Sequence, residues 1–522
     1  MSPIRRTTVN LVVLATLSTG FLLSTPGVAS AKGNNLFVTP TGTGAACLRA
    51  KPCGSIAAAL AVATPGATVH VAPGTYTEQD TIANARDDDV TILGSGATKS
   101  VVQPPASGLL SAADTDTSNP QYYALDVGPG IKASIKDLGI NGTSASAFFD
   151  ADGAGCSQDF DGIYVHDSTV KLTSVQVTGI DLPPDLAACA GGRGIYVASD
   201  SGSNASLTST GVLMPTASGA SFSGPTFPAY DTVGIACDDP GTSCSITSGK
   251  IQGMGSTNVV TQYGIQILGA SGLVNGASVS NNSYSAGGAG LEAAGVRAIN
   301  ASSLNIEHTA SLANDIDIDV AVIPSDGLMP PTIGPWTISD NTAESATDDV
   351  SAGENGYGEG IQVDSNTNSV TVEGNNASYD TQAGLYLIGA TSVTLESNTA
   401  NKNEVGIYVG GPGSAVGPST SNVISHNTLE KDTAGVIVDG AFDPAPPTGN
   451  GPNPDSASGN VFSANTWTLN LVNAADFSGW AGTSPVSMLD TWGSPTSDKC
   501  EPTPGGSSAL DSAVGNSDLY AC

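Results

Sequence analysis

One pattern recurs in Gly360-Ile-Gln-Val-Asp364, Gly384-Leu-Tyr-Leu-Ile388 and Gly406-Ile-Tyr-Val-Gly410, which begin 24 and then 22 residues apart. In each segment apolar side chains alternate behind a glycine, as in a short β-strand with one buried face. So short a period leaves room for three short strands and their turns, which is one coil of a β-helix. A propeller blade needs about 40 residues. The sequence therefore predicts an all-β solenoid.

The same pattern extends through much of the chain, with longer intervals that we interpret as loop insertions. It recurs behind Gly162, Gly194, Gly234, Gly264, Gly295 and Gly435. Asp315-Ile-Asp-Ile-Asp-Val320 is interpreted as an altered copy between Gly295 and Gly360. The apolar residues of the pattern should face the core in stacked rows; these include Ile163, Val165, Ile195, Val197, Ile265, Ile361 and Val363.

A second repeat places an apolar residue three positions before an asparagine. Its members are Ile338/Asn341, Val372/Asn375, Leu395/Asn398, Ile424/Asn427 and Phe462/Asn465. Asparagines at equivalent turns can hydrogen-bond from coil to coil, as they do in cross-β ladders. We therefore predict that these asparagines have a structural role.

The N-terminal region resembles a known family. It contains Asn35-Leu-Phe-Val38, Pro52-Cys-Gly-Ser-Ile-Ala-Ala-Ala-Leu60 and Val69-His-Val-Ala-Pro-Gly-Thr-Tyr-Thr-Glu78. These segments are similar to the start of secreted right-handed parallel β-helix proteins of the pectin-lyase-like superfamily, and with the repeats the likeness covers roughly residues 35–470. The resemblance implies a single-stranded right-handed parallel β-helix, an N-terminal helix cap near residues 55–63 and an irregular C-terminal cap. It leaves activity open, because the superfamily includes lyases, glycoside hydrolases, epimerases, tailspikes and non-catalytic surface proteins.

Four regions are expected along the chain. Residues 1–31 are interpreted as a signal peptide, because Arg5 and Arg6 precede an apolar stretch that ends in small residues. Residues 32–68 should form the N-terminal cap segment, 69–470 the β-helix and 471–522 the C-terminal cap or tail. No other apolar run reaches the ~18 residues of a membrane span. We therefore expect a secreted, extracellular protein.

The chain is strongly acidic. It carries 48 acidic against 16 basic residues, a formal net charge of −32. A nucleic-acid partner needs clustered lysine and arginine to displace counterions, so it is a poor candidate. The same repulsion disfavours anionic membrane surfaces.

The eight cysteines fall in neighbouring pairs, which favours local disulfides because short loops cost least to close. The preferred pairing is Cys47–Cys53, Cys156–Cys189, Cys237–Cys244 and Cys500–Cys522. Sequence alone allows about 105 pairings for eight cysteines. A zinc site is less favoured, because the cysteine spacings and the four scattered histidines match no zinc motif.

Candidate binding residues occupy the position between the two core-facing residues of the glycine pattern. That position should face outward and form a row with one residue per coil. The candidates for substrate binding are Tyr164, Tyr196, Gln266, Gln362, Tyr386 and Tyr408. Tyrosine rings suit sugar stacking with hydrogen bonding at the rim. The alternative is that tyrosine is simply a good strand residue.

The candidates for catalysis lie at the centre of the same row: Arg297, Asp317, Asp319 and Asp364. Strict alternation would point Asp315, Asp317 and Asp319 outward together. They could then bind calcium, with Asp317 and Asp319 as ligands, or form a general acid/base pair. The third interpretation is a solvated acidic strand. In a calcium-dependent lyase, Arg297 would abstract the substrate's proton.

A second polar cluster is expected near residues 150–193. Asp161 and Arg193 precede the glycine of successive repeats and should therefore pair. His166 is either a general acid or base, because histidine titrates near neutrality, or an ordinary surface residue.

Two classes of function remain. The galacturonan hydrolases of the superfamily carry Asn-Thr-Asp, Asp-Asp, Gly-His-Gly and Arg-Ile-Lys, and this chain has only Asp-Asp pairs such as Asp238-Asp239. The epimerase-like Asp-Pro-His is also missing. We expect a secreted protein that engages extracellular polysaccharide or a cell-surface glycan, with a carbohydrate lyase or glycoside hydrolase as the enzymatic version. The alternative is a non-catalytic secreted or cell-surface structural or binding protein.

Overall fold

The computed structural model separates two compact units, Met1–Lys32 and Gly33–Cys522. The expected signal peptide lies outside the described residues, as do Cys156, Cys189, Cys500 and Cys522. The described residues are 34–113, 120–145, 148–149, 158–180, 191–199, 204–214, 232–257, 261–285, 293–323, 330, 332–347, 358–365, 369–410, 419–432, 434–438, 457–458, 461–463, 465–468, 473–476 and 491–492.

Within the described residues the second unit is built from three 14-stranded sheets, and each coil contributes one strand to each sheet in turn. Sheet 1 contains β1 (Asn35–Val38), β2 (Thr68–Val71), β5 (Val90–Leu93), β9 (Lys132–Lys136), β12 (Thr169–Thr173), β15 (Ser206–Thr210), β18 (Ser243–Thr247), β21 (Ser271–Asn275), β24 (Ser303–Glu307), β27 (Trp336–Ser339), β30 (Val370–Glu373), β33 (Val393–Glu396), β37 (Val423–Ser425) and β41 (Val461–Ser463).

Sheet 2 contains β3 (Gly74–Thr77), β6 (Ser100–Gln103), β10 (Gly139–Asn141), β13 (Gln176–Thr178), β16 (Leu213–Met214), β19 (Lys250–Thr257), β22 (Ser278–Tyr284), β25 (Ala310–Leu312), β28 (Thr342–Glu344), β31 (Asn376–Ser378), β34 (Thr399–Asn401), β38 (Thr428–Glu430), β42 (Thr466–Thr468) and β44 (Thr491–Trp492).

Sheet 3 contains β4 (Asp80–Ile82), β8 (Pro120–Val127), β11 (Asp159–His166), β14 (Gly192–Ala198), β17 (Val233–Asp238), β20 (Tyr263–Leu268), β23 (Ala294–Ile299), β26 (Ile316–Ala321), β29 (Glu359–Asp364), β32 (Ala383–Ile388), β35 (Val405–Gly410), β39 (Ala434–Val438) and β43 (Asn473–Asp476), with β7 (Ser111–Ala113) antiparallel to β8. A short separate sheet pairs β36 (Ser419–Thr420) with β40 (Ala457–Ser458).

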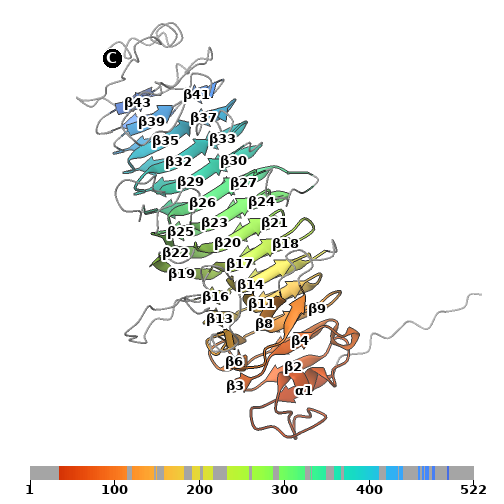
Figure 1. The fold of residues 1–522 in the computed structure, drawn as a ribbon. Coiled ribbons are helices and arrows are strands. Elements are labelled where there is room, and N and C mark those ends of the chain that lie inside the picture. Colours follow the sequence, from red (N-terminus) through yellow and green to blue (C-terminus); the bar gives the residue numbers. More distant parts are fainter. Residues whose placement is uncertain are drawn as a thin grey trace, which may run out of the picture. The chain divides into compact units, whose positions relative to one another are not determined.

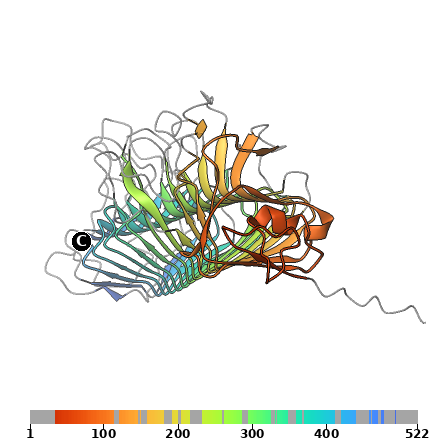
Figure 2. The ribbon, with the colours of Figure 1, turned by 90° about the horizontal axis from the view of Figure 1, so that it is seen from below.

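Every strand pairing within the three sheets is parallel apart from β7 with β8, and successive coils stack in chain order (Figure 1). Seen from below in Figure 2, the strands of successive coils overlie one another. The fold is the right-handed parallel β-helix that the repeats and the resemblance predicted, and right-handed crossovers are the rule between parallel strands.

The core fills the space between the sheets. All seven apolar residues predicted to face it are at most 1% exposed: Ile163, Val165, Ile195, Val197, Ile265, Ile361 and Val363. The predicted N-terminal helix is also confirmed as α1 (Ile56–Leu60). Ser55 caps it by accepting a hydrogen bond from the Ala58 N–H, and Ile56, Ala59 and Leu60 are buried.

Two predicted disulfides, Cys47–Cys53 and Cys237–Cys244, are present. The second joins β17 to β18, and both of its cysteines lie in the core. The position of Cys237 faces the core, as it does in the other coils, and Cys244 approaches it from sheet 1.

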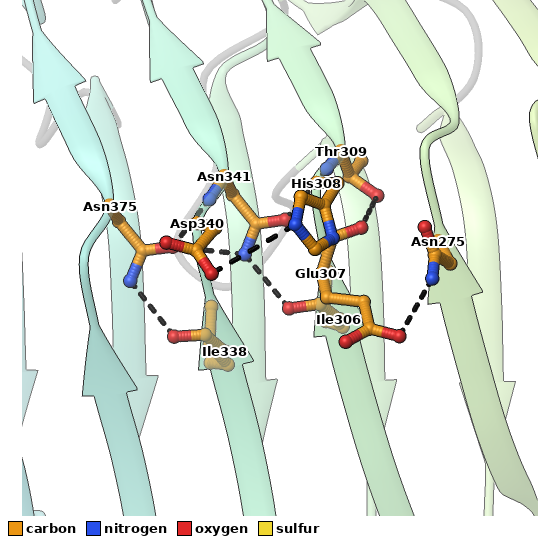
Figure 3. Close-up of polar contacts among 9 residues, drawn as sticks. All are labelled: Asn275, Ile306, Glu307, His308, Thr309, Ile338, Asp340, Asn341 and Asn375. Atoms are coloured by element: carbon orange, nitrogen blue, oxygen red, sulfur yellow. Dashed lines mark hydrogen bonds and ion pairs between the residues drawn. The ribbon is translucent and has the colours of Figure 1, made fainter.

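The predicted asparagine ladder is confirmed at the turn between sheets 1 and 2 (Figure 3). Asn341 donates both its backbone N–H and its side-chain amide to Asn375 Oδ1, each at 2.9 Å. The same two bonds recur in the following coils: Asn375 donates to Asn398, Asn398 to Asn427, and Asn427 to Asn465. Each side-chain amide also donates a hydrogen bond to the preceding coil; for example, Asn341 Nδ2 donates to Ile306 O at 2.9 Å. These bonds connect buried polar groups that would otherwise be unsatisfied.

Candidate functional site

The strands of sheet 3 bend at the glycine that precedes each core-facing pair. A Cβ on Gly162 would lie 2.6 Å from the core atom Val177 Cγ1, so this position faces inward. The next residue, Ile163, belongs to the main core as well. Two successive residues therefore face inward at the bend, and alternation resumes afterwards with Tyr164 outside the main core.

The predicted outward row is present in sheet 3. Its strand partners, in order, are Asp126, Tyr164, Tyr196, Ala236, Gln266, Arg297, Asp319, Gln362, Tyr386 and Tyr408. One coil differs from the prediction, because Asp319 and not Asp317 pairs with Arg297. The sequence alignment was shifted by two residues there, since the altered repeat has an aspartate in place of the glycine.

Asp317 occupies the inward glycine position, so its assignment to the catalytic row was wrong. The side chain is fully buried, and its Oδ1 accepts a hydrogen bond of 2.7 Å from Asn314 Nδ2. Burial raises the pKa of Asp317 well above its usual value, against hydrogen bonds from Asn314 and Ser311 that lower it. Asp319 faces away from the core, so the two carboxylates lie on opposite faces of β26 and do not form the shared calcium site that the sequence predicted.

Arg297, Asp319 and Gln362 do come together, from three successive strands. Arg297 Nε lies 3.3 Å from Asp319 Oδ2 in an ion pair. Asp319 is 2% exposed and also accepts a hydrogen bond of 3.4 Å from Gln362 Nε2. The guanidinium donates to the hydroxyl of Tyr263, and its carbon lies 4.9 Å from the centre of that ring. Arg297 is thus held in one orientation while 17% of its side chain stays exposed.

Asp364 lies on the same strand as Gln362, β29, in the neighbouring row. Its partners across the strands are Ala321 and Ile388, and its Oδ1 accepts a hydrogen bond of 2.7 Å from the Ser365 hydroxyl. Burial raises the pKa of Asp364, while the bonds from Ser365 and the charge of Arg297 lower it, and burial prevails. This carboxyl group therefore keeps its proton to a higher pH than an exposed aspartate.

The sequence predicts that the tyrosines of the row bind sugars, but in the structure these tyrosines are not accessible. Tyr164, Tyr196, Tyr386 and Tyr408 are 0%, 4%, 6% and 5% exposed. Neighbouring side chains cover each other: Tyr164 stacks on Tyr196 of the adjacent strand at 5.4 Å and on His166 of its own strand at 4.6 Å. Tyr386 meets Tyr408 edge to face at 5.0 Å. Gln362 is buried as well, whereas Gln266 is partly exposed.

The predicted pair of Asp161 and Arg193 is confirmed, with Nε 2.8 Å from Oδ1. Arg193 also lies 3.3 Å from Asp159 and donates to Gln121, and its guanidinium carbon is 3.6 Å from the centre of the Tyr196 ring. Burial lowers the pKa of Arg193, but Asp161 and Asp159 raise it, and the carboxylates prevail. Such a cation stays charged and serves to hold buried acids in place.

His166 lies 3.2 Å from Asp126, a residue that sequence reasoning missed. The signal was present in Ala124-Leu-Asp-Val127, which fits the repeat with alanine in place of glycine. The pair resembles a general base with its orienting carboxylate, but the histidine is only 12% exposed. Within the described residues, no group of three or more histidine, cysteine, aspartate or glutamate side chains is placed to hold a metal ion.

These features define a right-handed parallel β-helix with a polar row along sheet 3, which is the fold that the resemblance to pectin-lyase-like proteins implied. Residues 242–484 match the family described as "Periplasmic copper-binding protein (NosD)". No curated protein matches the chain in sequence.

Several solved structures are similar to this chain. The A-module of mannuronan C-5 epimerase AlgE6 from Azotobacter vinelandii is 13% identical, with 83% of this chain and 91% of that chain covered and a TM-score of 0.37. The family 28 exopolygalacturonase of Yersinia enterocolitica is 12% identical, covering 89% and 76%, with a TM-score of 0.37. Pectate lyase Pel9A is 12% identical, covering 80% and 82%, with a TM-score of 0.30. At these identities the likeness concerns the fold.

The two disulfides indicate an extracytoplasmic protein, because such bonds persist in oxidising compartments. In the part of the chain that the structure describes, no helix is both long and apolar enough to cross a membrane.

Proposed function

We propose that this protein is secreted and engages an extracellular polysaccharide through the face of sheet 3 around Arg297. One observation carries the proposal: the Arg297 guanidinium is fixed by Asp319 and Tyr263 and yet remains partly exposed. A cation held in one orientation loses little conformational freedom when it binds hydroxyl or carboxylate groups of a sugar. The partly exposed Gln266, on the coil before Arg297, and Asp364, two coils after it, add hydrogen-bonding groups.

A second candidate function, glycan cleavage, is favoured by Asp364. A carboxyl group with a raised pKa beside a binding surface is a proton donor of the kind that glycosidases use. In this version Asp364 would protonate the leaving oxygen, Arg297 would contact the sugar, and Asp319 would act as a positioning residue for Arg297. A calcium-assisted lyase is a further version of the proposal. In that version the calcium ion would not be bound by Asp317 and Asp319 together, because these two side chains lie on opposite faces of β26.

The test exposes the purified protein to a panel of neutral and acidic polysaccharides, with and without calcium. Retention on a glycan without product indicates a binding protein. New reducing ends without unsaturated products indicate a hydrolase, and new reducing ends with ultraviolet absorption of unsaturated products indicate a lyase. The absence of both retention and product across the panel would contradict the proposal.

Replacing Arg297 by alanine is expected to weaken glycan binding about tenfold, as for loss of a charge-assisted hydrogen bond. Because Asp319 would lose its cation, Arg297→Ala also lowers stability, so its folding is checked by thermal denaturation. Gln266→Ala serves as a second variant, expected to weaken binding severalfold with no loss of stability. Its matched control is Gln176→Ala on sheet 2, which should bind as the unmodified protein does. Equal binding by all four proteins would exclude this face as the site.

A further inference from the structure

A separate groove of about 510 Å³ lies on sheet 2. Its volume is in the range of small-molecule sites. The groove is lined by residues of β28, β31 and β34 and of the turns that follow β31, β34 and β38, among them Glu344, Asn376, Tyr379, Asn401, Lys402 and Lys431. None of these residues belongs to the row on sheet 3.

The sharp turn after each strand of sheet 2 aligns one wall of the groove. Tyr379, Lys402 and Lys431 have φ angles of 68°, 62° and 65°, in the left-handed region. They are equivalent in successive coils, because the Tyr379 N–H bonds to Asn401 O and the Lys402 N–H bonds to Glu430 O. Three long side chains thus follow one another at the spacing of neighbouring strands, about 4.8 Å.

The groove holds two of the few basic side chains of a strongly acidic protein, together with Glu344. The chain has 16 lysines and arginines in 522 residues, and two of them meet here. Lys402 makes no ion pair with any described residue. Its Nζ donates a hydrogen bond of 2.9 Å to the Tyr379 hydroxyl and lies 4.4 Å from the centre of that ring. Lys431 Nζ lies 2.7 Å from Glu430, with 49% of its side chain exposed.

Two further features suit a sugar. Tyr379 is 51% exposed, unlike the covered tyrosines of sheet 3. Asn401 lines the groove, and its Oδ1 has no hydrogen-bond partner among the described residues, so a small rotation of the side chain would present an unused acceptor to a ligand hydroxyl. The Glu344 carboxylate is engaged by the amide of Asn376, which reduces its repulsion of an anion.

We propose that this groove binds a carboxylate-bearing sugar chain. The carboxylate lies at Lys402 and Lys431, a sugar ring contacts Tyr379, and a hydroxyl group donates to Asn401 Oδ1. An acidic peptide also offers carboxylates and N–H donors, but the exposed ring of Tyr379 favours the flat face of a sugar ring. The inference rests on the proposed function for the class of ligand, while the site is a different one.

The experiment measures binding of oligogalacturonate by isothermal titration calorimetry, with a neutral oligogalactan and an oligoglutamate as comparison ligands. Lys402→Ala and Tyr379→Ala are each expected to weaken oligogalacturonate binding about tenfold. Rising salt should weaken binding by the unmodified protein more than binding by Lys402→Ala. Lys402→Arg should retain most of the affinity. The matched control is Lys171→Ala, at an exposed position on sheet 1.

The outcomes separate the two proposals. If Lys402→Ala and Tyr379→Ala lose affinity while Arg297→Ala retains it, the groove is the site for the acidic sugar and the sheet 3 proposal fails for this ligand. If only Arg297→Ala loses affinity, the groove proposal is overturned and the proposed function stands. The groove proposal is also overturned if oligoglutamate or the neutral oligogalactan binds with the same affinity as oligogalacturonate. Thermal denaturation checks folding, which Lys402→Ala and Tyr379→Ala should leave unchanged because both residues are exposed.

Discussion

Replacing Asn398 by alanine is expected to lower the free energy of unfolding by about 3–5 kcal/mol. Asn398 Oδ1 accepts two hydrogen bonds from Asn375, and Asn398 Nδ2 donates to Val372 O at 2.9 Å. Alanine removes these three bonds and the bond from Asn398 Nδ2 to Asn427 Oδ1, and it leaves their partners buried. Each buried polar group without a partner costs about 1–3 kcal/mol. Denaturant unfolding followed by circular dichroism measures the change.

The matched control is Asn305→Ala. Asn305 lies on the partly exposed face of β24, and its Oδ1 has no hydrogen-bond partner in the described structure. Its loss should therefore change stability by less than about 0.5 kcal/mol. If the two variants are equally stable, the ladder does not stabilise the fold as argued.

Stability is expected to fall as the pH rises from 4 to 8, which is the reverse of ordinary acid denaturation. A second ladder, between sheets 2 and 3, contains buried aspartates: the Ala346 N–H bonds to Asp380 Oδ1, and the Asn403 N–H bonds to Asp432 Oδ1. Burial raises the pKa of Asp432 to about 8. Burial also raises the pKa of Asp380 well above its usual value, with added repulsion from Asp317.

The direction of this pH dependence follows from the pKa values of the carboxyls in the folded and the unfolded state. Each of these carboxyls has a higher pKa in the folded protein than in the unfolded chain, so folding favours its protonated form. The contribution to stability is complete below the unfolded pKa, near 3.9, and for Asp432 it is lost as the pH rises through about 8. One pKa unit corresponds to about 1.4 kcal/mol, so the total change is on the order of a few kcal/mol. The thermal midpoint should therefore be higher at pH 5 than at pH 8.

Asp380→Asn separates the buried carboxyls from general charge repulsion. Asparagine occupies the same ladder position in the next coil, where Asn403 Nδ2 donates to Ala377 O at 3.2 Å. The variant should be more stable than the unmodified protein at pH 8 and depend less on pH. The control Asp340→Asn removes an equal charge from a side chain that is 61% exposed, and should leave the pH dependence almost unchanged. A thermal midpoint that rises from pH 5 to pH 8 would contradict the prediction.

The repeats predicted the fold well because each repeat corresponds to the strands and turns of one coil. Each coil of a β-helix repeats the same short strands and the same turns. The alternation within a strand therefore predicts the core-facing residues around Ile195, and the recurring turn predicts the ladder through Asn398. Asp161 with Arg193 could be paired from the sequence for the same reason, since each precedes the glycine of its repeat. Residues in equivalent positions of successive coils become neighbours.

The candidate site was predicted less well, and particular residues show why. Asp317 was misplaced because alternation fails at the bend, where two successive residues face inward. Tyr164 and Tyr386 were expected to be accessible, but direction does not determine exposure when neighbouring side chains cover each other. The groove around Tyr379 and Lys402 was missed because it depends on left-handed turns, which a strand pattern does not encode.

The asparagine ladder has a consequence for how the chain is completed. In the ladder, the backbone N–H groups of Asn341, Asn375, Asn398 and Asn427 each bond to the coil nearer the C-terminus. Those of Ala346, Asp380 and Asn403 have the same sense. A newly formed coil therefore presents unsatisfied donors until its successor is added. Synthesis from the N-terminus would always leave one incomplete rung at the growing end, which the next coil fills. The ladder thus gives assembly of the solenoid a direction, and each finished coil is a template for the one that follows.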